Sequence, residues 1–164
     1  MPRPVREIIQ QRKQFTSPEE EVLIALQMAA SRVMEPWMQQ LKAQAGLTPN
    51  QYNVLRILRG AAPEGLTCGE IGGRMITRDP DITRLVDRLV RSGLVRRRRS
   101  SADRRVVRVY ITGAGLSVLA GLDAAVSELP VRMIGSLGSR RLSTLRSLLE
   151  EVIECASAQN REMS

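Results

Sequence analysis

The segment from Asp79 to Ser92 constrains the fold most, because its residue pattern predicts a short helix with two chemically different faces. Asp79 can cap this helix, and Pro80 suits its first position. Apolar side chains recur at the spacing of a single helical face, at Ile82, Leu85, Val86, Leu89 and Val90. At about 100° per residue, arginines gather on the opposite face, at Arg84, Arg88 and Arg91. We therefore expect an apolar face packed on a core and an arginine face pointing outward.

After Gly93 the pattern changes from helical to alternating, which predicts a β-hairpin. Residues 94–99 form its first strand, residues 100–103 a polar turn, and residues 106–111 its second strand. Upstream, capping-box patterns begin at Ser17, Thr48 and Thr67, each with Glu or Gln three residues later. They predict a long helix ending at Gly46 with a kink or an interruption at Pro36, a second ending at Gly60, and a brief third.

Two further helices are expected after the hairpin. Thr112 can cap a helix running toward Leu129, where Pro130 should bend or stop it. The last helix is amphipathic, with an apolar stripe at Leu142, Leu145, Leu148, Leu149, Val152 and Ile153. Taken together, the element order predicts a mainly α fold with a small β-hairpin wing, in which a winged helix-turn-helix head lies between N- and C-terminal helices.

The positive charge of the chain is concentrated in one segment. Residues 74–108 contain twelve Arg and four Asp, a net charge of +8, which equals the formal net charge of all 164 residues. A solvated basic face would also carry such a run, but every basic residue here is Arg, which can bind phosphates or guanine edges through two nitrogens. We therefore expect a nucleic acid as the partner, ahead of a membrane or simple solvation.

Composition argues against catalysis and cofactor binding. The chain has no His, so the commonest general base and transition-metal ligand is missing, and it shows no paired nucleophile and base and no phosphate-binding loop. We expect no enzyme activity, no cofactor and no metal. Two cysteines, Cys68 and Cys155, are too few for a disulfide framework. With no signal-peptide pattern in residues 1–15 and nothing later that approaches a membrane span, we expect a soluble, cytoplasmic protein without membrane contact.

Three motifs carry a resemblance to a known family: residues 82–89 (ITRLVDRL), residues 92–95 (SGLV), and Asp103-Arg104-Arg105 with its following alternating strand. They are similar to the MarR family of bacterial transcriptional regulators. The resemblance implies one domain over residues 1–164, with a DNA-binding head at 48–111 and dimerisation helices at 17–46 and 112–158. It also implies a homodimer that usually represses transcription. The apolar stripes of the first and last long helices favour a two-fold partner independently.

Candidate DNA contacts fall on the helix and the hairpin. The recognition helix should lie in the major groove and offer Thr77, Arg78, Asp81, Thr83, Arg84 and Arg88. The wing should meet the minor groove or the backbone with Arg97, Arg98, Arg99, Ser100, Ser101 and Arg104. The family pattern implies that Asp103 and Arg105 stabilise the wing. Asp87 can pair with Arg91 and is expected only to brace the helix, whereas Asp81 either caps the helix or contacts DNA.

Two switches are candidates for releasing DNA. Family members commonly respond to a small lipophilic or aromatic effector, and the side chains that could line its pocket are Met34, Trp37, Met38 and Tyr52. Ordinary core packing explains their spacing equally, and we favour it. The other candidate is oxidation of Cys68, in the first turn of a predicted helix, although its position does not match the family's peroxide sensors.

Two alternatives to a ligand-released repressor remain open. One is a winged-helix protein that binds DNA without sequence preference, as an architectural protein. The other is a regulator switched by redox chemistry at Cys68. The expected partners are thus double-stranded DNA, a second copy of the chain and a small effector.

Overall fold

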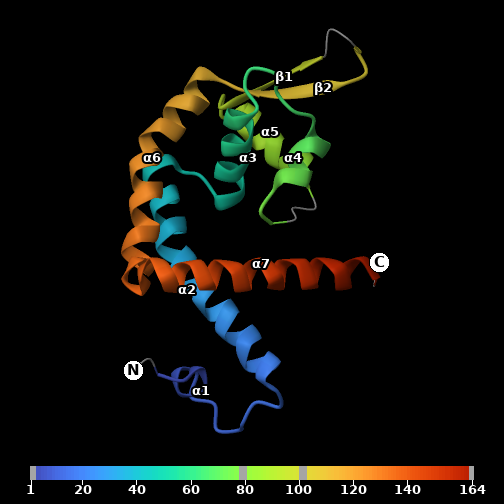
Figure 1. The fold of residues 1–164 in the computed structure, drawn as a ribbon. Coiled ribbons are helices and arrows are strands. Elements are labelled where there is room, and N and C mark those ends of the chain that lie inside the picture. Colours follow the sequence, from blue (N-terminus) through green and yellow to red (C-terminus); the bar gives the residue numbers. More distant parts are fainter. Residues whose placement is uncertain (1–2, 78–80, 100–102, 163–164) are drawn as a thin grey trace. The chain divides into compact units, whose positions relative to one another are not determined.

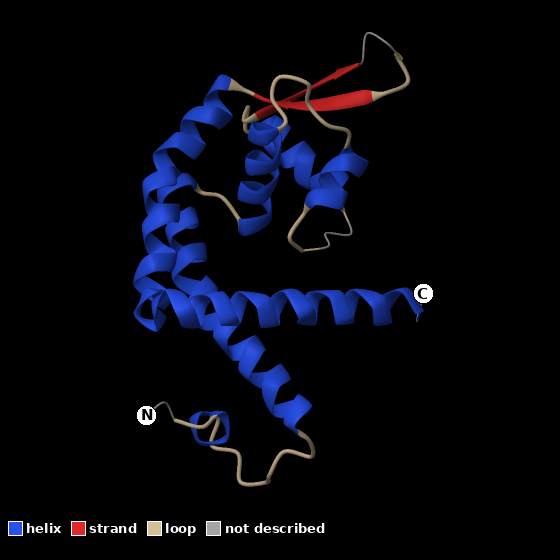
Figure 2. Cartoon of the chain, viewed as in Figure 1, coloured by secondary structure: helices blue, strands red, loops and turns tan. Residues whose placement is uncertain are grey.

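The computed structural model describes residues 3–77, 81–99 and 103–162, and Figure 1 follows the elements in chain order. Contacts within the chain divide it into two compact units, Met1–Ala125 and Val126–Ser164, which are described separately. Figure 2 shows that the regular structure of the described residues is mostly helical, with one two-stranded hairpin, so the predicted fold class is confirmed.

The first unit opens with a short helix, α1 (Val5–Ile8), and a long one, α2 (Pro18–Ala45). Ser17 caps α2 as predicted, because its side chain accepts a hydrogen bond from the Glu20 backbone N–H at 3.2 Å. Of the kink or interruption predicted at Pro36, the interruption is wrong, since α2 continues through this residue to Ala45 and its left-handed C-cap Gly46, while the kink stays a prediction. A proline removes one intrahelical hydrogen bond, and the turns on both sides of Pro36 keep theirs.

Helices α3 (Pro49–Gly60) and α4 (Cys68–Arg74) both begin with the predicted capping boxes. In each, the threonine oxygen accepts from the backbone of the third helical residue, whose side chain accepts from the threonine N–H in return. Each box satisfies backbone donors that a short helix would otherwise leave open. The two helices contact each other, and both contact the next helix.

Helix α5 spans Ile82–Arg91, and its N-cap is Asp81. The prediction that Asp79 caps it is wrong; Asp79 and Pro80 lie outside the described residues. Asp81 takes the role because one carboxylate oxygen accepts from the Arg84 backbone N–H at 3.0 Å. The predicted inward face is confirmed at its centre, where Leu85, Val86 and Leu89 are buried.

The hairpin consists of β1 (Val95–Arg99) and β2 (Val107–Ile111), paired antiparallel with Val95 opposite Ile111. Its base joins the core of the head, because Val95 and Val109 are buried. Leu66 extends the pairing as a bridge to Val109, with N···O distances of 3.0 and 2.7 Å in the two directions. The wing is therefore anchored to the turn that precedes α4.

Helix α6 (Gly113–Ile134) starts after Thr112, whose hydroxyl accepts from the Gly115 N–H at 3.1 Å, as the sequence predicts. The helix does not stop at Pro130 but continues to Ile134. Its first part belongs to the head unit, where Arg59 of α3 binds the Asp123 carboxylate through both oxygens at 2.9 Å. This contact between α3 and α6 was not foreseen from the sequence.

The second unit holds the end of α6, a 3₁₀ turn η1 (Gly135–Leu137) and α7 (Gly138–Glu162). Much of the predicted apolar stripe of α7 is exposed, at Leu145, Leu148, Val152 and Ile153. Residues 113–159 also include a helical stretch that is long and apolar enough to cross a membrane by length and composition alone. The expectation that nothing approaches such a stretch was therefore wrong, although helices at subunit contacts and in protein cores have the same composition.

Candidate nucleic-acid interface

The outer face of α5 presents polar and basic side chains to solvent. Thr83, Arg84 and Arg88 are exposed, whereas the opposite face packs on α3 and α4. Thr77, in the turn before the helix, is also exposed and donates its hydroxyl hydrogen to Asn50 at 3.0 Å. Arg78 was predicted for the same surface and lies outside the described residues. The described candidates are thus exposed in the turn before α5 and along the outer face of the helix.

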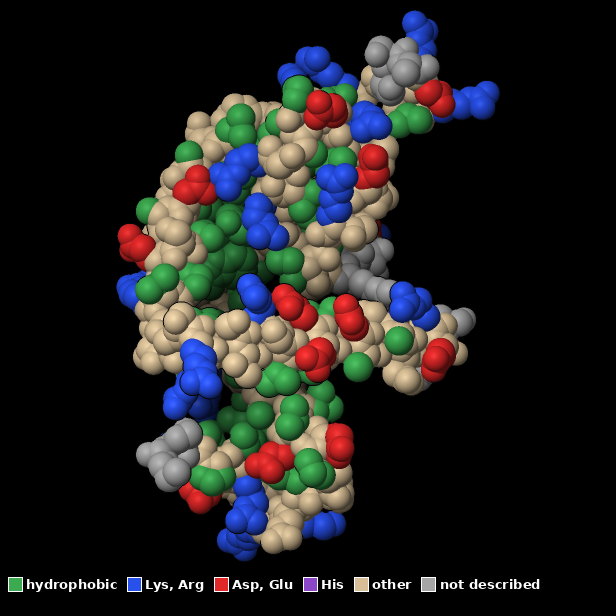
Figure 3. All heavy atoms as spheres, viewed as in Figure 1, with side chains coloured by type: hydrophobic (Ala, Val, Ile, Leu, Met, Phe, Trp, Pro, Cys, Tyr) green, Lys and Arg blue, Asp and Glu red, His purple; other side chains and the backbone are tan. Residues whose placement is uncertain are grey.

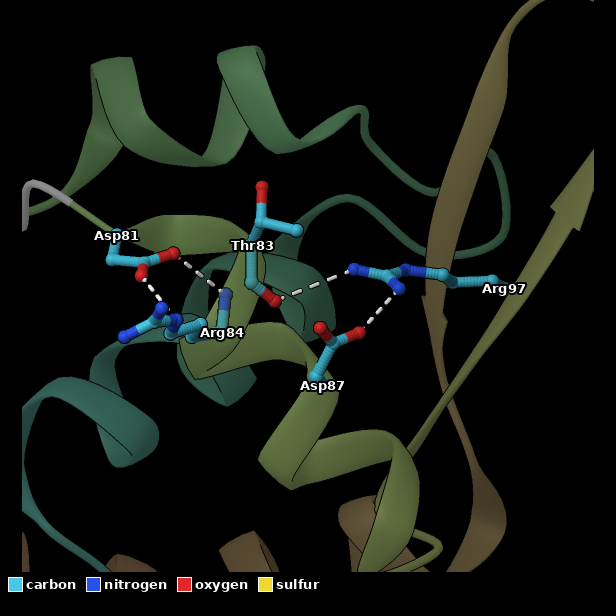
Figure 4. A network of polar contacts seen from close by, with 5 residues as sticks. All are labelled: Asp81, Thr83, Arg84, Asp87 and Arg97. Atoms are coloured by element: carbon cyan, nitrogen blue, oxygen red, sulfur yellow. Dashed lines mark hydrogen bonds and ion pairs between the residues drawn. The ribbon is translucent and has the colours of Figure 1, made fainter.

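Asp81 and Arg84 form a local pair at the helix start, drawn in Figure 4. The Arg84 Nε lies 2.9 Å from one Asp81 carboxylate oxygen, while the other oxygen caps the helix. The Arg84 side chain remains 79% exposed, so its guanidinium is held at the surface without being enclosed. Asp81 therefore both caps the helix and orients this arginine at the surface.

A second pair connects the wing to the recognition helix. The Arg97 guanidinium of β1 bonds to the Asp87 carboxylate of α5 and donates to the Thr83 carbonyl oxygen at 3.4 Å (Figure 4). The two side chains of the pair are 32% and 35% exposed. The predicted pairing of Asp87 with Arg91 is wrong, because Asp87 reaches across to the hairpin, although its bracing character is as expected. The structure thus gives Arg97 a partner within the protein.

The other arginines of β1 differ by strand face. Arg97 and Arg99 share a face with buried Val95, and Arg96 and Arg98 share the other face. Arg98, Arg99 and Arg104 are exposed, and on the face seen in Figure 3 several Lys and Arg side chains lie over the head and the hairpin. Ser100 and Ser101 lie outside the described residues. These exposed guanidinium groups make the wing strongly electropositive.

The wing turn is organised by Asp103. Its carboxylate accepts from the Arg105 backbone N–H at 2.9 Å, and its carbonyl oxygen accepts from the Val106 N–H at 3.0 Å. Both bonds restrain the chain as it enters β2. Arg105 takes part in this turn through its backbone, and its side chain is exposed. This geometry fits a wing-stabilising role for Asp103, which stays a prediction.

Arg108 provides a brace that sequence reasoning missed. Its guanidinium donates to the Gly65 carbonyl oxygen at 3.0 Å and lies 3.7 Å from a Glu70 carboxylate oxygen. The Glu70 pKa lies below its ordinary value, chiefly because the carboxylate accepts from the Thr67 backbone N–H and hydroxyl, with smaller help from Arg108. The only signal in the sequence was the alternation of inward- and outward-facing residues along β2, which does not identify the residues that Arg108 contacts.

The side chains predicted to line an effector pocket differ in their burial. Tyr52 is buried and packs edge to face against Trp37, with ring centroids 5.3 Å apart, while Met34 and Met38 are exposed on α2. Cys68 is half-buried at the first position of α4, and Cys155 is exposed. In the described part of the chain no three acidic or cysteine side chains are grouped as metal ligands. The ligand pocket and the redox role both stay predictions.

Comparison with known sequences finds similarity to transcriptional regulators. A sequence model of the MarR family matches residues 45–106, which run from the end of α2 through β1. The HTH-type transcriptional regulator TtmR of Methylorubrum extorquens (strain PA1) is 36% identical over 112 residues, which cover 68% of this chain and 54% of TtmR. The aligned part thus spans about half of TtmR's length.

Solved structures give the same result over most of the chain. A MarR transcription factor from Planctomyces limnophilus is 38% identical with a TM-score of 0.62, covering 84% of this chain and 98% of its own. Sco3205, a MarR family regulator from Streptomyces coelicolor crystallised in complex with DNA, has a TM-score of 0.75 at 23% identity, covering 88% of this chain and 91% of its own. At that identity the second likeness concerns the fold.

Proposed function

Since the chain belongs to the MarR family of DNA-binding transcriptional regulators, we propose that it acts as a cytoplasmic homodimer on a pseudo-palindromic operator. The observation that carries this proposal is the exposed basic surface shared by α5 and the wing. Thr77, Asp81, Thr83, Arg84 and Arg88 are the proposed base-reading set, with Arg78 added from the sequence. Arg98, Arg99 and Arg104 are the proposed wing contacts, with Ser100 and Ser101 added from the sequence.

Helix α5 suits the major groove for reasons of geometry and charge. Its buried face fixes it on α3 and α4, so its exposed face can be presented rigidly. Arg84 and Arg88 are four residues apart and can approach the same duplex. Arginine is the side chain best suited to guanine, because two of its nitrogens match the two acceptors on the groove edge. The DNA-bound Sco3205 structure supports this use of the fold.

We do not include Arg97 among the proposed DNA contacts. Its guanidinium is already bonded to Asp87 and to the Thr83 carbonyl oxygen, and breaking both contacts would be needed to reach a phosphate. We assign it the role of holding the hairpin against α5. The wing arginines beyond it then approach DNA at a fixed angle to the recognition helix.

Dimerisation is proposed from exposed apolar side chains on the terminal helices. Along α7, Leu148 and Ile153 are 54% and 64% exposed and lie on the same stripe as Leu145 and Val152. Near the start of α2, Leu23 is 66% exposed. Apolar surface on this scale costs free energy in water, and a second copy of the chain can cover it. The same contacts would explain the apolar composition of residues 113–159.

The decisive experiment selects source-genome fragments bound by the purified protein. We expect enrichment of an inverted repeat whose half-sites are about 10 bp apart, centre to centre. A scrambled repeat of the same composition is the control and should bind at least ~1,000-fold more weakly at physiological salt. Equal binding of both duplexes would overturn the proposal in favour of an architectural protein that binds without sequence preference.

Light scattering on the purified protein tests the dimer. The double variant Leu148→Glu/Ile153→Glu should halve the mass, because two carboxylates would be placed on the proposed contact stripe. Ser147→Glu is the matched control, since Ser147 is exposed on the opposite side of the same helix and should leave the mass unchanged. A monomeric wild-type protein, or a double variant that remains dimeric, would contradict this arrangement.

We propose repression as the mode of regulation, with release by a small lipophilic or aromatic ligand. Repression needs only that an occupied operator blocks another protein, which the compact basic head allows. Adding candidate ligands and peroxide separately to the DNA complex tests the switch. Loss of binding with peroxide alone, abolished by Cys68→Ser, would replace the ligand with redox chemistry.

A further inference from the structure

Ile76 is a large apolar side chain beside the proposed base-reading surface. It lies in the loop that follows α4 (Figure 1), directly before Thr77. At 74% it is the most exposed large apolar side chain among the described residues. Single apolar side chains are common on protein surfaces, so exposure alone assigns no role. What distinguishes Ile76 is its position next to Thr77 and the way in which its loop is held.

The residues on both sides of Ile76 are anchored to α3. The Asn53 side-chain N–H donates to the Met75 sulfur at 3.6 Å, and the Thr77 hydroxyl donates to the Asn50 side-chain oxygen at 3.0 Å. Asn50 and Asn53 are three residues apart, so they lie on the same face of α3. Two contacts to one helix face therefore restrain the backbone at Ile76, while its own side chain stays in solvent.

The proposed dimer does not account for the exposure of Ile76. The next most exposed large apolar side chains are Val131 on α6, Leu23 on α2 and Ile153 on α7. These three lie on the helices whose apolar surface the proposed dimer would cover. Ile76 instead belongs to the DNA-binding head, within the residues that match the MarR family model. The partner that covers it is therefore sought on the DNA.

We propose that Ile76 contacts the 5-methyl group of a thymine in the major groove, an inference that rests on the proposed DNA-binding function. This methyl is the apolar group on the base edges of that groove, whereas the other bases present hydrogen-bonding groups there. The proposed base-reading set contains only Thr, Asp and Arg, which suit the polar groups. Neighbouring Cα atoms are about 3.8 Å apart and stacked base pairs about 3.4 Å, so Ile76 and Thr77 can face the same or adjacent base pairs.

The contact removes apolar surface of both partners from water. Burial of one methyl group corresponds to about a fourfold gain in affinity, so two symmetry-related half-sites together give about 15-fold. Because the contacts to Asn50 and Asn53 order the loop before DNA arrives, little conformational freedom is lost on binding. At this position a T·A pair is favoured over a C·G pair, since cytosine has no methyl group.

Deoxyuridine in the selected operator tests the contact, because it lacks the thymine methyl and pairs with adenine in the same way. Each thymine is replaced in both half-sites together, and affinity is measured by fluorescence anisotropy. At one position deoxyuridine should weaken wild-type binding about 15-fold. Ile76→Ser should bind the thymine operator about 15-fold more weakly than the wild type and should not respond to deoxyuridine at that position. Ile76→Val, which keeps a branched apolar side chain, should retain most of the deoxyuridine effect.

Val107→Ser is the matched control. Val107 is exposed on β2, so this substitution also removes an exposed apolar side chain from the head. The wing is assigned to the minor groove or the backbone, where no thymine methyl lies, so the variant should keep the wild-type response to deoxyuridine. Because Ile76 is exposed, Ile76→Ser should have the wild-type urea midpoint, and light scattering should give the wild-type mass.

Four outcomes would overturn the role of Ile76 and leave the proposed function standing. They are a preferred operator that tolerates deoxyuridine at every position, an equal deoxyuridine effect in Ile76→Ser and the wild type, a loss of the effect in Val107→Ser, and a changed mass of Ile76→Ser. The last would make Ile76 a contact between protein chains. A protein that prefers no operator at all would refute the proposed function and this contact together.

Discussion

Substitutions that neutralise Asp87 or Arg97 test whether Arg97 holds the wing against α5 or binds DNA. If Arg97 binds a phosphate and Asp87 is merely a nearby negative charge, Asp87→Asn should strengthen DNA binding. If the pair holds the wing against α5, the same substitution should weaken DNA binding. The hairpin of the variant is no longer held in place, so DNA binding must also order it. The two assignments therefore predict effects of opposite sign for one isosteric change.

The size of the effect follows from the exposure of the pair. Fully exposed ion pairs contribute about 0.2–1 kcal/mol, and breaking a buried one costs about 3–5 kcal/mol. With side chains 32% and 35% exposed, the Asp87–Arg97 pair lies nearer the exposed class, so we expect a coupling energy of about 1 kcal/mol. Urea unfolding of Asp87→Asn, Arg97→Gln and the double variant measures this energy directly.

Salt dependence supplies the second measurement. Each phosphate contact contributes about 0.9 to the slope of log K against log salt concentration. Fluorescence anisotropy at several salt concentrations should give Arg97→Gln the wild-type slope, although its affinity falls. Arg98→Gln, the matched wing variant, should lose about one unit of slope.

Three results would refute this assignment of Arg97. One is an increase in DNA affinity for Asp87→Asn, and another is a slope for Arg97→Gln as low as that for Arg98→Gln. The third is a double variant whose destabilisation equals the sum of the single ones within about 0.3 kcal/mol. Any of them would return Arg97 to the set of DNA contacts predicted from the sequence.

Three further predictions concern the helices of the head. Gly115→Ala should destabilise the protein by about 1–3 kcal/mol in urea unfolding, because the new Cβ would lie 2.4 Å from the Leu94 carbonyl oxygen. Gly73→Ala is the control: its new Cβ would meet no heavy atom within 4 Å, so this variant should be as stable as the wild type or more stable. The lowered pKa of Glu70 contributes stability that is present above pH 4.5 and is lost as the pH falls through the folded-state pKa. In Glu70→Gln the free energy of unfolding should therefore fall less steeply at acidic pH. An unchanged dependence on pH would contradict this. Arg84→Ala should cost about 1–3 kcal/mol of operator binding and relax preference at one base pair, as measured with singly substituted operators; a uniform loss across all operators would exclude base reading.

Local sequence signals were sufficient for most elements. The capping boxes at Thr48 and Thr67 start helices where predicted, because each pairs a side chain with backbone groups only three residues away. The hairpin bounds differ by one residue at the first position of each strand. Errors occurred where two local signals competed, as at Asp79 and Asp81, either of which could cap α5 by residue type alone.

The sequence by itself determined the element order, the arginine face of α5 and the concentration of charge in residues 74–108, since each follows from residue type and spacing along the chain. Only the tertiary structure decided which arginines have their guanidinium groups bound to other residues of the protein. Arg97 and Arg108 look like their neighbours in sequence, yet they bind Asp87 and Gly65 on other elements, ten and 43 residues away. The segment from Asp79 to Ser92 predicted a reading helix, but the angle at which the wing accompanies it depends on contacts that form only when the chain has folded.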